Sequence, residues 1–295
     1  MMEPRGARRV GVVAKASSPD ASRVAGELIE WLRRRGLEAW VEAGTARESG
    51  HPGDGALEEG TRCDLVVVLG GDGTLLSVAR KAAGGPPILG VNLGHLGFLT
   101  EVPRSDLYPA LLEVLAGHYT IEPRSLLEVE HQRAGRGRVG YRALNDVVVA
   151  KSALSRMIEL ILSVDGRLVA RYRADGLVVS TPTGSTAYNL SAGGPILHPL
   201  LPVAVLTPIC PHTLTLRPLV VPDTSVIEVA IEARDDAPEV RADRVFLTVD
   251  GQEGGEISFG DRIRISRAAQ PAYLVRTGER SSIFDGLRNK LHWGE

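Results

Sequence analysis

The sequence predicts an α/β N-terminal domain with a Rossmann-like parallel sheet, followed by an all-β sandwich domain, with a C-terminal helix closing the chain. In the first third, short apolar runs alternate with amphipathic stretches, a pattern typical of parallel strands covered by helices. From Tyr119 onward, apolar residues instead alternate with polar ones and hairpin signals separate the runs. A chain of 295 residues is long enough for two such domains.

These changes of pattern also predict where the chain divides. We expect the α/β domain over residues 1–104 and the sandwich over 105–270. Residues 271–295 form a C-terminal segment that we expect to pack back on the N-terminal domain.

The first helix of the α/β domain has a signal at each end. Ser18 before Pro19 supplies an N-cap and a first-turn proline, and Gly36 offers a left-handed stop. The other elements predicted in this half are strands at 10–14, 37–41, 65–69 and 88–91, helices at 74–83 and 105–118, and a Gly- and Glu-rich loop at 42–60.

The second half contains a clear hairpin signal. Glu159–Val164 and Arg167–Tyr172 flank the turn Asp165–Gly166. Further predicted strands lie at 147–150, 226–232, 245–249 and 262–266, and a terminal helix at 282–292.

Composition excludes several classes of function. A net charge of -2 and a pI of about 6.4 provide no positive field for nucleic acid or an anionic membrane. No run approaches the roughly 20 apolar residues that a membrane span needs. The two cysteines, Cys63 and Cys210, have no metal-binding or disulfide spacing. We therefore expect a cytoplasmic protein that acts on small molecules.

The strongest local signal is Gly70-Gly71-Asp72-Gly73-Thr74, which follows a buried strand and precedes a helix. Glycines leave the backbone open and can adopt positive φ, so successive N–H groups can converge on phosphate oxygens at a helix N-terminus. Thr74 can cap that helix. The alternative is a tight turn with Asp72 as the cap, but three glycines favour a phosphate site. Neither the P-loop nor the GxGxxG fingerprint is present.

A second motif covers Asp175–Tyr188 and continues through Ser191–Pro195. It combines a strand with a hydroxyl-rich loop, and Tyr188 offers a ring for stacking and an O–H for donation. Such a loop can hold a nucleoside. The alternative is a Ser/Thr-rich hairpin connection.

Together these motifs resemble the NAD kinase family, which uses ATP or polyphosphate as donor. GGDGT alone resembles a wider group that includes diacylglycerol and sphingosine kinases and, more distantly, phosphofructokinases. The ordered match of 175–188 distinguishes NAD kinases. The resemblance implies phosphorylation of the 2′ hydroxyl of the adenosine ribose of NAD to give NADP, with Mg²⁺ or another divalent cation accompanying ATP. It also implies a homodimer or homotetramer.

The same resemblance assigns roles to individual residues. It implies an α/β domain that binds the phosphate donor and a sandwich that binds NAD, with Asp72 as the catalytic residue and no metal ion held directly by the protein. The phosphate and ATP contacts implied are Gly70, Gly71, Gly73 and Thr74. The NAD contacts implied are Asp72, Gly73, Phe98, Asn145, Asp146, Asp175, Thr183, Thr186, Ala187 and Tyr188, and Asp250 and Gln252 belong to a late family motif.

Two other functions compete with this hypothesis. A diacylglycerol-type lipid kinase shares GGDGT, but the chain shows no basic amphipathic helix for a membrane surface. A non-catalytic dinucleotide-binding module is the second alternative, and the presence of Asp72 argues against it. The choice between ATP and polyphosphate, the use of NADH, and feedback by NADP or NADPH stay open at this point.

Overall fold

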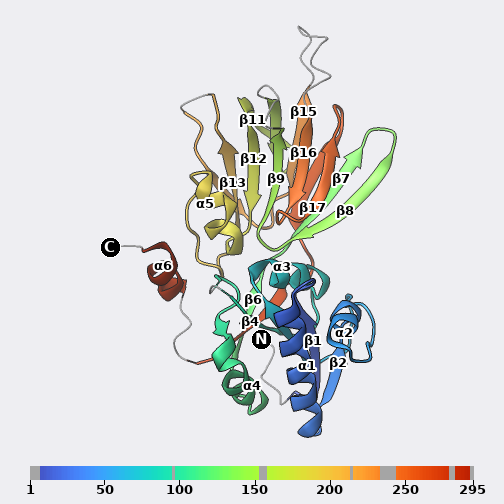
Figure 1. Cartoon of the computed structure of the whole chain (residues 1–295). Helices are drawn as coiled ribbons and strands as arrows, with labels where there is room; N and C mark the ends of the chain where they lie inside the picture. The colour runs from blue at the N-terminus through green and yellow to red at the C-terminus, as the bar shows by residue number, and fades with distance from the viewer. Residues whose placement is uncertain are drawn as a thin grey trace. The chain divides into compact units, whose positions relative to one another are not determined.

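The computed structural model describes residues 7–94, 97–152, 158–212, 215–232, 244–278 and 283–292 (Figure 1). The chain divides into two compact units, one formed by Met1–Arg124 with Pro271–Glu295 and the other by Ser125–Gln270. The first division thus lies twenty residues after the predicted position at 104, because the strand Thr120–Arg124 joins the sheet of the first unit.

The first unit contains a mixed, mainly parallel sheet. Its strands are β1 Arg9–Ala14, β2 Glu38–Val41, β3 Leu65–Gly70, β4 Ile88–Asn92, β5 Val102–Pro103, β6 Thr120–Arg124 and β19 Ala272–Arg276. The order is β2-β1-β3-β4-β19-β6, and β5 also pairs with β4. All residues of β3 and β4 are buried, as expected for strands covered on both faces. The predicted parallel sheet is confirmed, and β6 adds one antiparallel edge.

The helices of this unit are α1 Pro19–Arg34, α2 Ala43–Ser49, α3 Asp72–Lys81, a 3₁₀ turn at Arg104–Asp106, α4 Leu107–Leu115 and α6 Ile283–Leu291. The predicted cap of α1 is confirmed, because the Ser18 Oγ accepts the Ala21 N–H. The loop predicted over 42–60 is wrong in part, since α2 lies within it. Glu42 begins α2 by accepting the Thr45 N–H at 2.8 Å. None of the described helices is both long and apolar enough to cross a bilayer.

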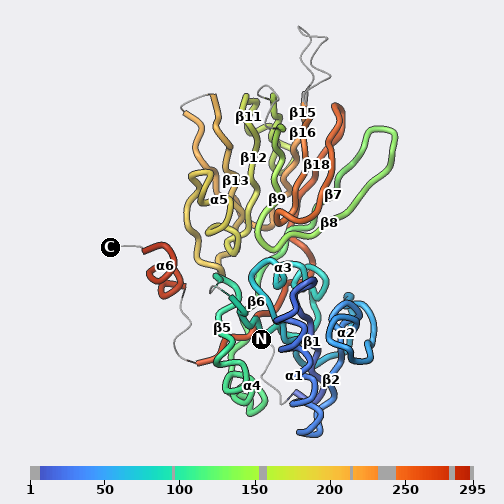
Figure 2. Tube along the Cα trace, in the orientation of Figure 1, coloured from blue at the N-terminus to red at the C-terminus, as the bar shows by residue number. Residues whose placement is uncertain are grey.

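The second unit contains two antiparallel sheets of six strands each among the described residues. One has the order β11-β10-β15-β18-β7-β8 and the other β14-β13-β12-β9-β16-β17. Figure 2 traces the same path as a tube. The bounds are β7 Leu127–Arg133, β8 Gly137–Ala143, β9 Asp146–Lys151, β10 Ile158–Val164, β11 Arg167–Ala174, β12 Gly176–Ser180, β13 Val203–Ile209, β14 Leu219–Pro222, β15 Ile227–Glu232, β16 Val245–Val249, β17 Glu253–Ile257 and β18 Arg262–Arg267. The predicted sandwich is confirmed.

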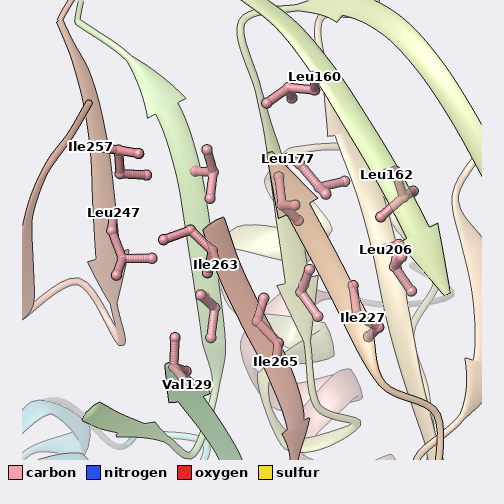
Figure 3. Packing of buried hydrophobic residues seen from close by; sticks show 14 of the residues in the cluster. Val129, Leu160, Leu162, Leu177, Leu206, Ile227, Leu247, Ile257, Ile263 and Ile265 are labelled. Carbon is pink, nitrogen blue, oxygen red and sulfur yellow. The ribbon is translucent and has the colours of Figure 1, made fainter. Parts of the chain in front are cut away.

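The core of the second unit is built by aliphatic side chains from both sheets. Leu160, Ile227 and Ile263 come from one sheet, and Leu177 and Leu247 from the other, and they belong to one buried cluster (Figure 3). Burial of such side chains stabilises a fold by roughly 1.5–3 kcal/mol each. This shared core fixes three strands with candidate site residues at their ends: β12 within the second motif, β9 beside Asn145 and β16 beside Asp250.

A substitution in this core tests the sandwich. Ile263 has 0% of its surface exposed, so Ile263→Ala should lower the free energy of unfolding by about 2–5 kcal/mol through lost burial and a residual cavity. Urea unfolding followed by circular dichroism measures the change. Arg264→Ala, on the opposite face of β18, should shift stability by no more than about 0.5 kcal/mol. Equal effects of the two substitutions would contradict the assigned faces of β18.

Candidate functional site

The glycine-rich loop joins β3 to α3 with very little connecting chain. Gly71 is the N-cap of α3, with φ of -108°, and no side chain bonds to the helix start. The helix therefore begins at Asp72, two residues before the predicted start, and the expected cap at Thr74 is wrong. Gly70 ends the strand and Gly73 lies inside the helix, so positive φ is not what the glycines provide. Gly70 provides space, because a Cβ there would lie 2.6 Å from the Thr74 Oγ1.

The Asp72 carboxylate is bound by the segment that follows β4. Its Oδ1 accepts the N–H groups of Leu99 at 3.1 Å and Thr100 at 3.0 Å, and also the Thr100 hydroxyl at 2.9 Å. Its Oδ2 accepts the Phe98 N–H at 2.7 Å. A carboxylate oxygen has about two lone-pair sites, so Oδ2 retains room for one further donor. Asp72 therefore fixes the segment 98–100, and its Oδ2 still has one acceptor position to spare.

Gly97 is a site residue that the sequence reasoning did not identify. A Cβ at Gly97 would run into the Asp72 carboxylate. The close approach of backbone and carboxylate thus requires glycine at this position. Only the fold shows what Gly97 faces.

A cavity of about 510 Å³ lies beside the start of α3. Gly71, Gly73 and Thr74 line it, together with Lys15 and Lys81. Neither lysine forms an ion pair with any described residue. The N-terminal turn of a helix presents N–H groups and the positive end of the helix dipole, so this cavity suits a phosphate group.

In the second unit, Asp250 organises the start of β9. Its carboxylate accepts the N–H groups of Leu144 at 3.0 Å, Asn145 at 2.7 Å and Asp146 at 3.1 Å. Asp250 itself adopts a left-handed φ of 50°. The structure therefore brings together Asn145, Asp146 and Asp250, three of the residues that the sequence singled out.

The hydroxyl-rich loop lies against the same segment. The Thr181 N–H donates to the Asn145 carbonyl at 2.9 Å, and the Thr181 hydroxyl donates to the Leu144 carbonyl at 2.5 Å. A Cβ at Gly184 would run into the Asn145 backbone. Instead of an open loop, the segment forms a 3₁₀ turn, Thr183–Thr186, and the short helix α5, Tyr188–Ser191 (Figure 1).

Thr183 stands out in this turn because its Oγ1 is buried and has no hydrogen-bond partner among the described residues. A buried hydroxyl without a partner is costly, by roughly 1–3 kcal/mol. A ligand that bonds to this hydroxyl would remove the cost.

The remaining residues of the motif lie at different places in the second unit. Thr186 and Ala187 are half-buried, Tyr188 is 44% exposed, and Gln252 is exposed. Asp175 does not join the cluster. Ser180 pairs with Asp146, whereas Asp175 adjoins the opposite end of β12 and forms an ion pair with Lys151 at 3.5 Å.

Comparison with known proteins finds matches to both parts of the chain. The model of the ATP-NAD kinase N-terminal domain matches residues 10–119, and that of the ATP-NAD kinase C-terminal domain matches 144–277. The NAD kinase of Geotalea daltonii is 47% identical over 290 residues, covering 98% of this chain and 99% of the relative. The chain belongs to the NAD kinase family.

Other members of the family agree. The NAD kinase of Geobacter sulfurreducens is 46% identical, covering 98% of this chain and 99% of the relative. Yeast NADH kinase complexed with NADH is similar in structure, with a TM-score of 0.87, 28% identity and coverage of 98% of this chain and 88% of that one. An NAD kinase from Archaeoglobus fulgidus in complex with ATP has a TM-score of 0.72, 28% identity and coverage of 96% and 98%.

Within this NAD kinase fold, Asp146 has an unusual environment. It is 5% exposed, and its burial, followed by the nearby charge of Asp250, raises the pKa of its carboxyl from 3.8 to about 7. The side chain therefore changes charge near neutral pH. It can donate a hydrogen bond below that pH and only accept one above it.

Gly97→Ala tests the contact with Asp72. The added methyl should displace the Asp72 carboxylate, and phosphoryl transfer should fall by roughly 10²-fold, because small misplacements of reacting groups have effects of that size. Gly94→Ala is a matched control, since a Cβ at that position would lie 3.9 Å from its nearest neighbour, the Asn92 Oδ1. Steady-state rates and melting temperatures of both variants are compared. Similar activity in both would contradict the proposed constraint.

Asp146→Asn tests the raised pKa. Between pH values near 4 and 7 the folded state binds the proton more tightly than the unfolded state, so this carboxyl contributes less stability as pH rises through that window. The asparagine variant lacks this loss. Relative to wild type, it should gain stability from about pH 4 to about pH 7, by at most about 4 kcal/mol. Thermal unfolding at several pH values measures the difference, and a constant difference would contradict the raised pKa.

Proposed function

We propose that this protein transfers the γ-phosphoryl group of ATP to the 2′ hydroxyl of the adenosine ribose of NAD, giving NADP and ADP. The observation that carries the proposal is the Asp72 carboxylate, which the Phe98–Thr100 segment holds at the start of α3 with one lone-pair site of Oδ2 to spare. The relatives named NAD kinase support the reaction. Structural neighbours whose titles name NADH and ATP support the two substrates.

On the donor side, the cavity beside α3 supports binding of the ATP phosphates by the backbone of Gly70, Gly71, Gly73 and Thr74. A bond forms between the 2′ oxygen and the γ-phosphorus, and the bond from that phosphorus to the β–γ bridging oxygen breaks. We assign the departing hydroxyl proton to the Asp72 Oδ2. In a loose transition state this proton leaves late, so orientation of the hydroxyl by Asp72 matters as much as its removal.

On the acceptor side, we assign NAD contacts to Asp72, Gly73, Phe98, Asn145, Asp146, Thr183, Thr186, Ala187 and Tyr188. The Thr183 hydroxyl, buried and without a partner among the described residues, supports a ligand at this turn. The exposed ring of Tyr188 is accessible for stacking. Asp175, near the other end of β12, is assigned to the nicotinamide half, and Asp250 positions Asn145 and Asp146 through their N–H groups.

A divalent cation, such as Mg²⁺, is part of the proposal. Among the described residues there is no group of three or more His, Cys, Asp or Glu side chains with metal-binding geometry. We propose that the ATP phosphates and water coordinate this ion, which is usual for Mg²⁺. When bound, the ion neutralises charge on the donor phosphates.

The proposal also covers the oligomeric state of the protein and its location in the cell. Leu219 and Val220 lie exposed on the edge strand β14, and Leu200 and Leu201 are exposed on the segment before β13. Exposed apolar side chains of this kind support a homodimer or homotetramer. Both cysteines, Cys63 and Cys210, are free, which supports a cytoplasmic location.

The direct test is incubation of purified protein with NAD and MgATP, and detection of NADP with an NADP-specific dehydrogenase. Asp72→Asn should lower turnover by at least roughly 10². The asparagine of this variant also places a side-chain amide against the backbone N–H donors that bind Asp72. The melting temperature of the variant is therefore measured alongside. Parallel reactions with polyphosphate and with NADH define the donor and acceptor range.

Each outcome of this test has a definite meaning. A folded wild-type protein that forms no NADP from either donor would overturn the proposed function. An Asp72→Asn variant with normal turnover would remove Asp72 from the mechanism. Lower turnover with an unchanged melting temperature would show that Asp72 acts in the reaction itself and does not only hold the Phe98–Thr100 segment.

A further inference from the structure

The C-terminal helix α6 places a cation next to the segment that holds Asp72. Lys290 is half-buried, and its Nζ lies 4.6 Å from the centroid of the Phe98 ring. The N–H of the same Phe98 donates to the Asp72 Oδ2. One residue therefore connects the ammonium of Lys290 with the carboxylate at which we place the reaction.

A second residue of α6, Gly286, also lies against the Phe98 ring. A Cβ at Gly286 would lie 3.7 Å from the Cδ1 and Cε1 atoms of the Phe98 ring. Gly286 and Lys290 are four residues apart and so share one face of the helix. The ring thus packs on this face, and the position of Lys290 is set by helix packing as well as by its own rotamer.

The described surroundings of Lys290 give its charge no direct counter-ion. Burial lowers the pKa of Lys290, and the negative charges of Asp72 and Glu101 oppose that effect. Both of those charges have other partners: Arg276 lies 2.6 Å from Glu101, and backbone N–H groups bind Asp72. Lys290 itself forms no ion pair with any described residue.

The use of lysine in this chain adds an independent observation. Lysine and arginine number 34 in total, and the lysines are only Lys15, Lys81, Lys151 and Lys290. Lys15 and Lys81 line the cavity beside α3, and Lys290 lines a second cavity of about 740 Å³ in the first unit. Lysine presents a compact charge that suits single phosphate oxygens, whereas arginine suits planar, bidentate contacts.

We propose that Lys290 is a further phosphate-binding residue of the transfer site, which contacts the oxygens of the phosphoryl group that is delivered beside Asp72. This inference rests on the proposed function. The ammonium stays protonated and makes no covalent bond. It neutralises negative charge while the 2′ oxygen bonds to the γ-phosphorus and the bridging oxygen leaves with ADP.

The test compares Lys290→Met, which keeps an apolar stem beside Phe98, with Lys290→Arg, which keeps the charge. Lys290→Met should lower kcat/KM for NAD phosphorylation by about tenfold or more, the usual size of a lost charged hydrogen bond. Lys290→Arg should recover most of the loss. Arg288→Met is the matched control on the same helix, because Arg288 is exposed and pairs only locally with Asp285 among the described residues.

The difference between NADP and NAD binding is a second readout, and a loss of helix packing alone would not change this difference. NADP differs from NAD by the transferred phosphate, so Lys290→Met should weaken NADP binding by about tenfold more than NAD binding in calorimetry. Equal weakening of both, or a loss of activity that follows a lower melting temperature, would reduce Lys290 to a packing role and overturn the inference. Wild type without NADP formation would overturn the proposed function itself, whereas a fully active Lys290→Met variant would overturn only this assignment.

Discussion

The candidate site depends on one kind of interaction, a carboxylate that accepts hydrogen bonds from three successive backbone amides. Asp72 binds residues 98–100 in this way, and Asp250 binds residues 144–146. Hydrogen bonds to an ionised acceptor are stronger than neutral ones, so three of them can hold a segment that lies largely outside regular structure. In each unit, a single acidic side chain thereby fixes backbone that carries residues we assign to ligand binding.

Local patterns were sufficient to predict most of the regular elements. Apart from Arg9 and Asn92 at their ends, the strands β1, β3 and β4 are apolar because both faces of the sheet are covered, and this leaves a plain signal in the sequence. Helix α2 escaped prediction because glutamate is an uncommon cap and seven residues are too few to show a helical period. The position of β19 beside β4 depends on a pairing of Leu274 with Ile88, and no local pattern records a contact between such distant residues.

The site likewise combines local motifs, which the sequence shows, with contacts between distant residues, which it does not show. Gly70–Thr74 and Asp175–Tyr188 are contiguous motifs, so they were found from sequence. Gly97 and Lys290 matter through what they touch, Asp72 and Phe98 respectively, and a lone residue carries no such information. The raised pKa of Asp146 likewise arises from burial and from Asp250, which is 104 residues away in the chain.

The insertion of β19 between β4 and β6 has a consequence for biosynthesis. The second unit, Ser125–Gln270, is continuous and contains all of its own strands, so it can fold as soon as it leaves the ribosome. The sheet of the first unit has to wait for Ala272–Arg276 to emerge, although its other strands are made first. During that interval β5 covers only the Val91–Asn92 end of β4, and the part of the edge at Ile88 lacks its neighbour β19. An uncovered strand edge is open to pairing with other chains. The half of the protein that is translated first is therefore the half that finishes folding last.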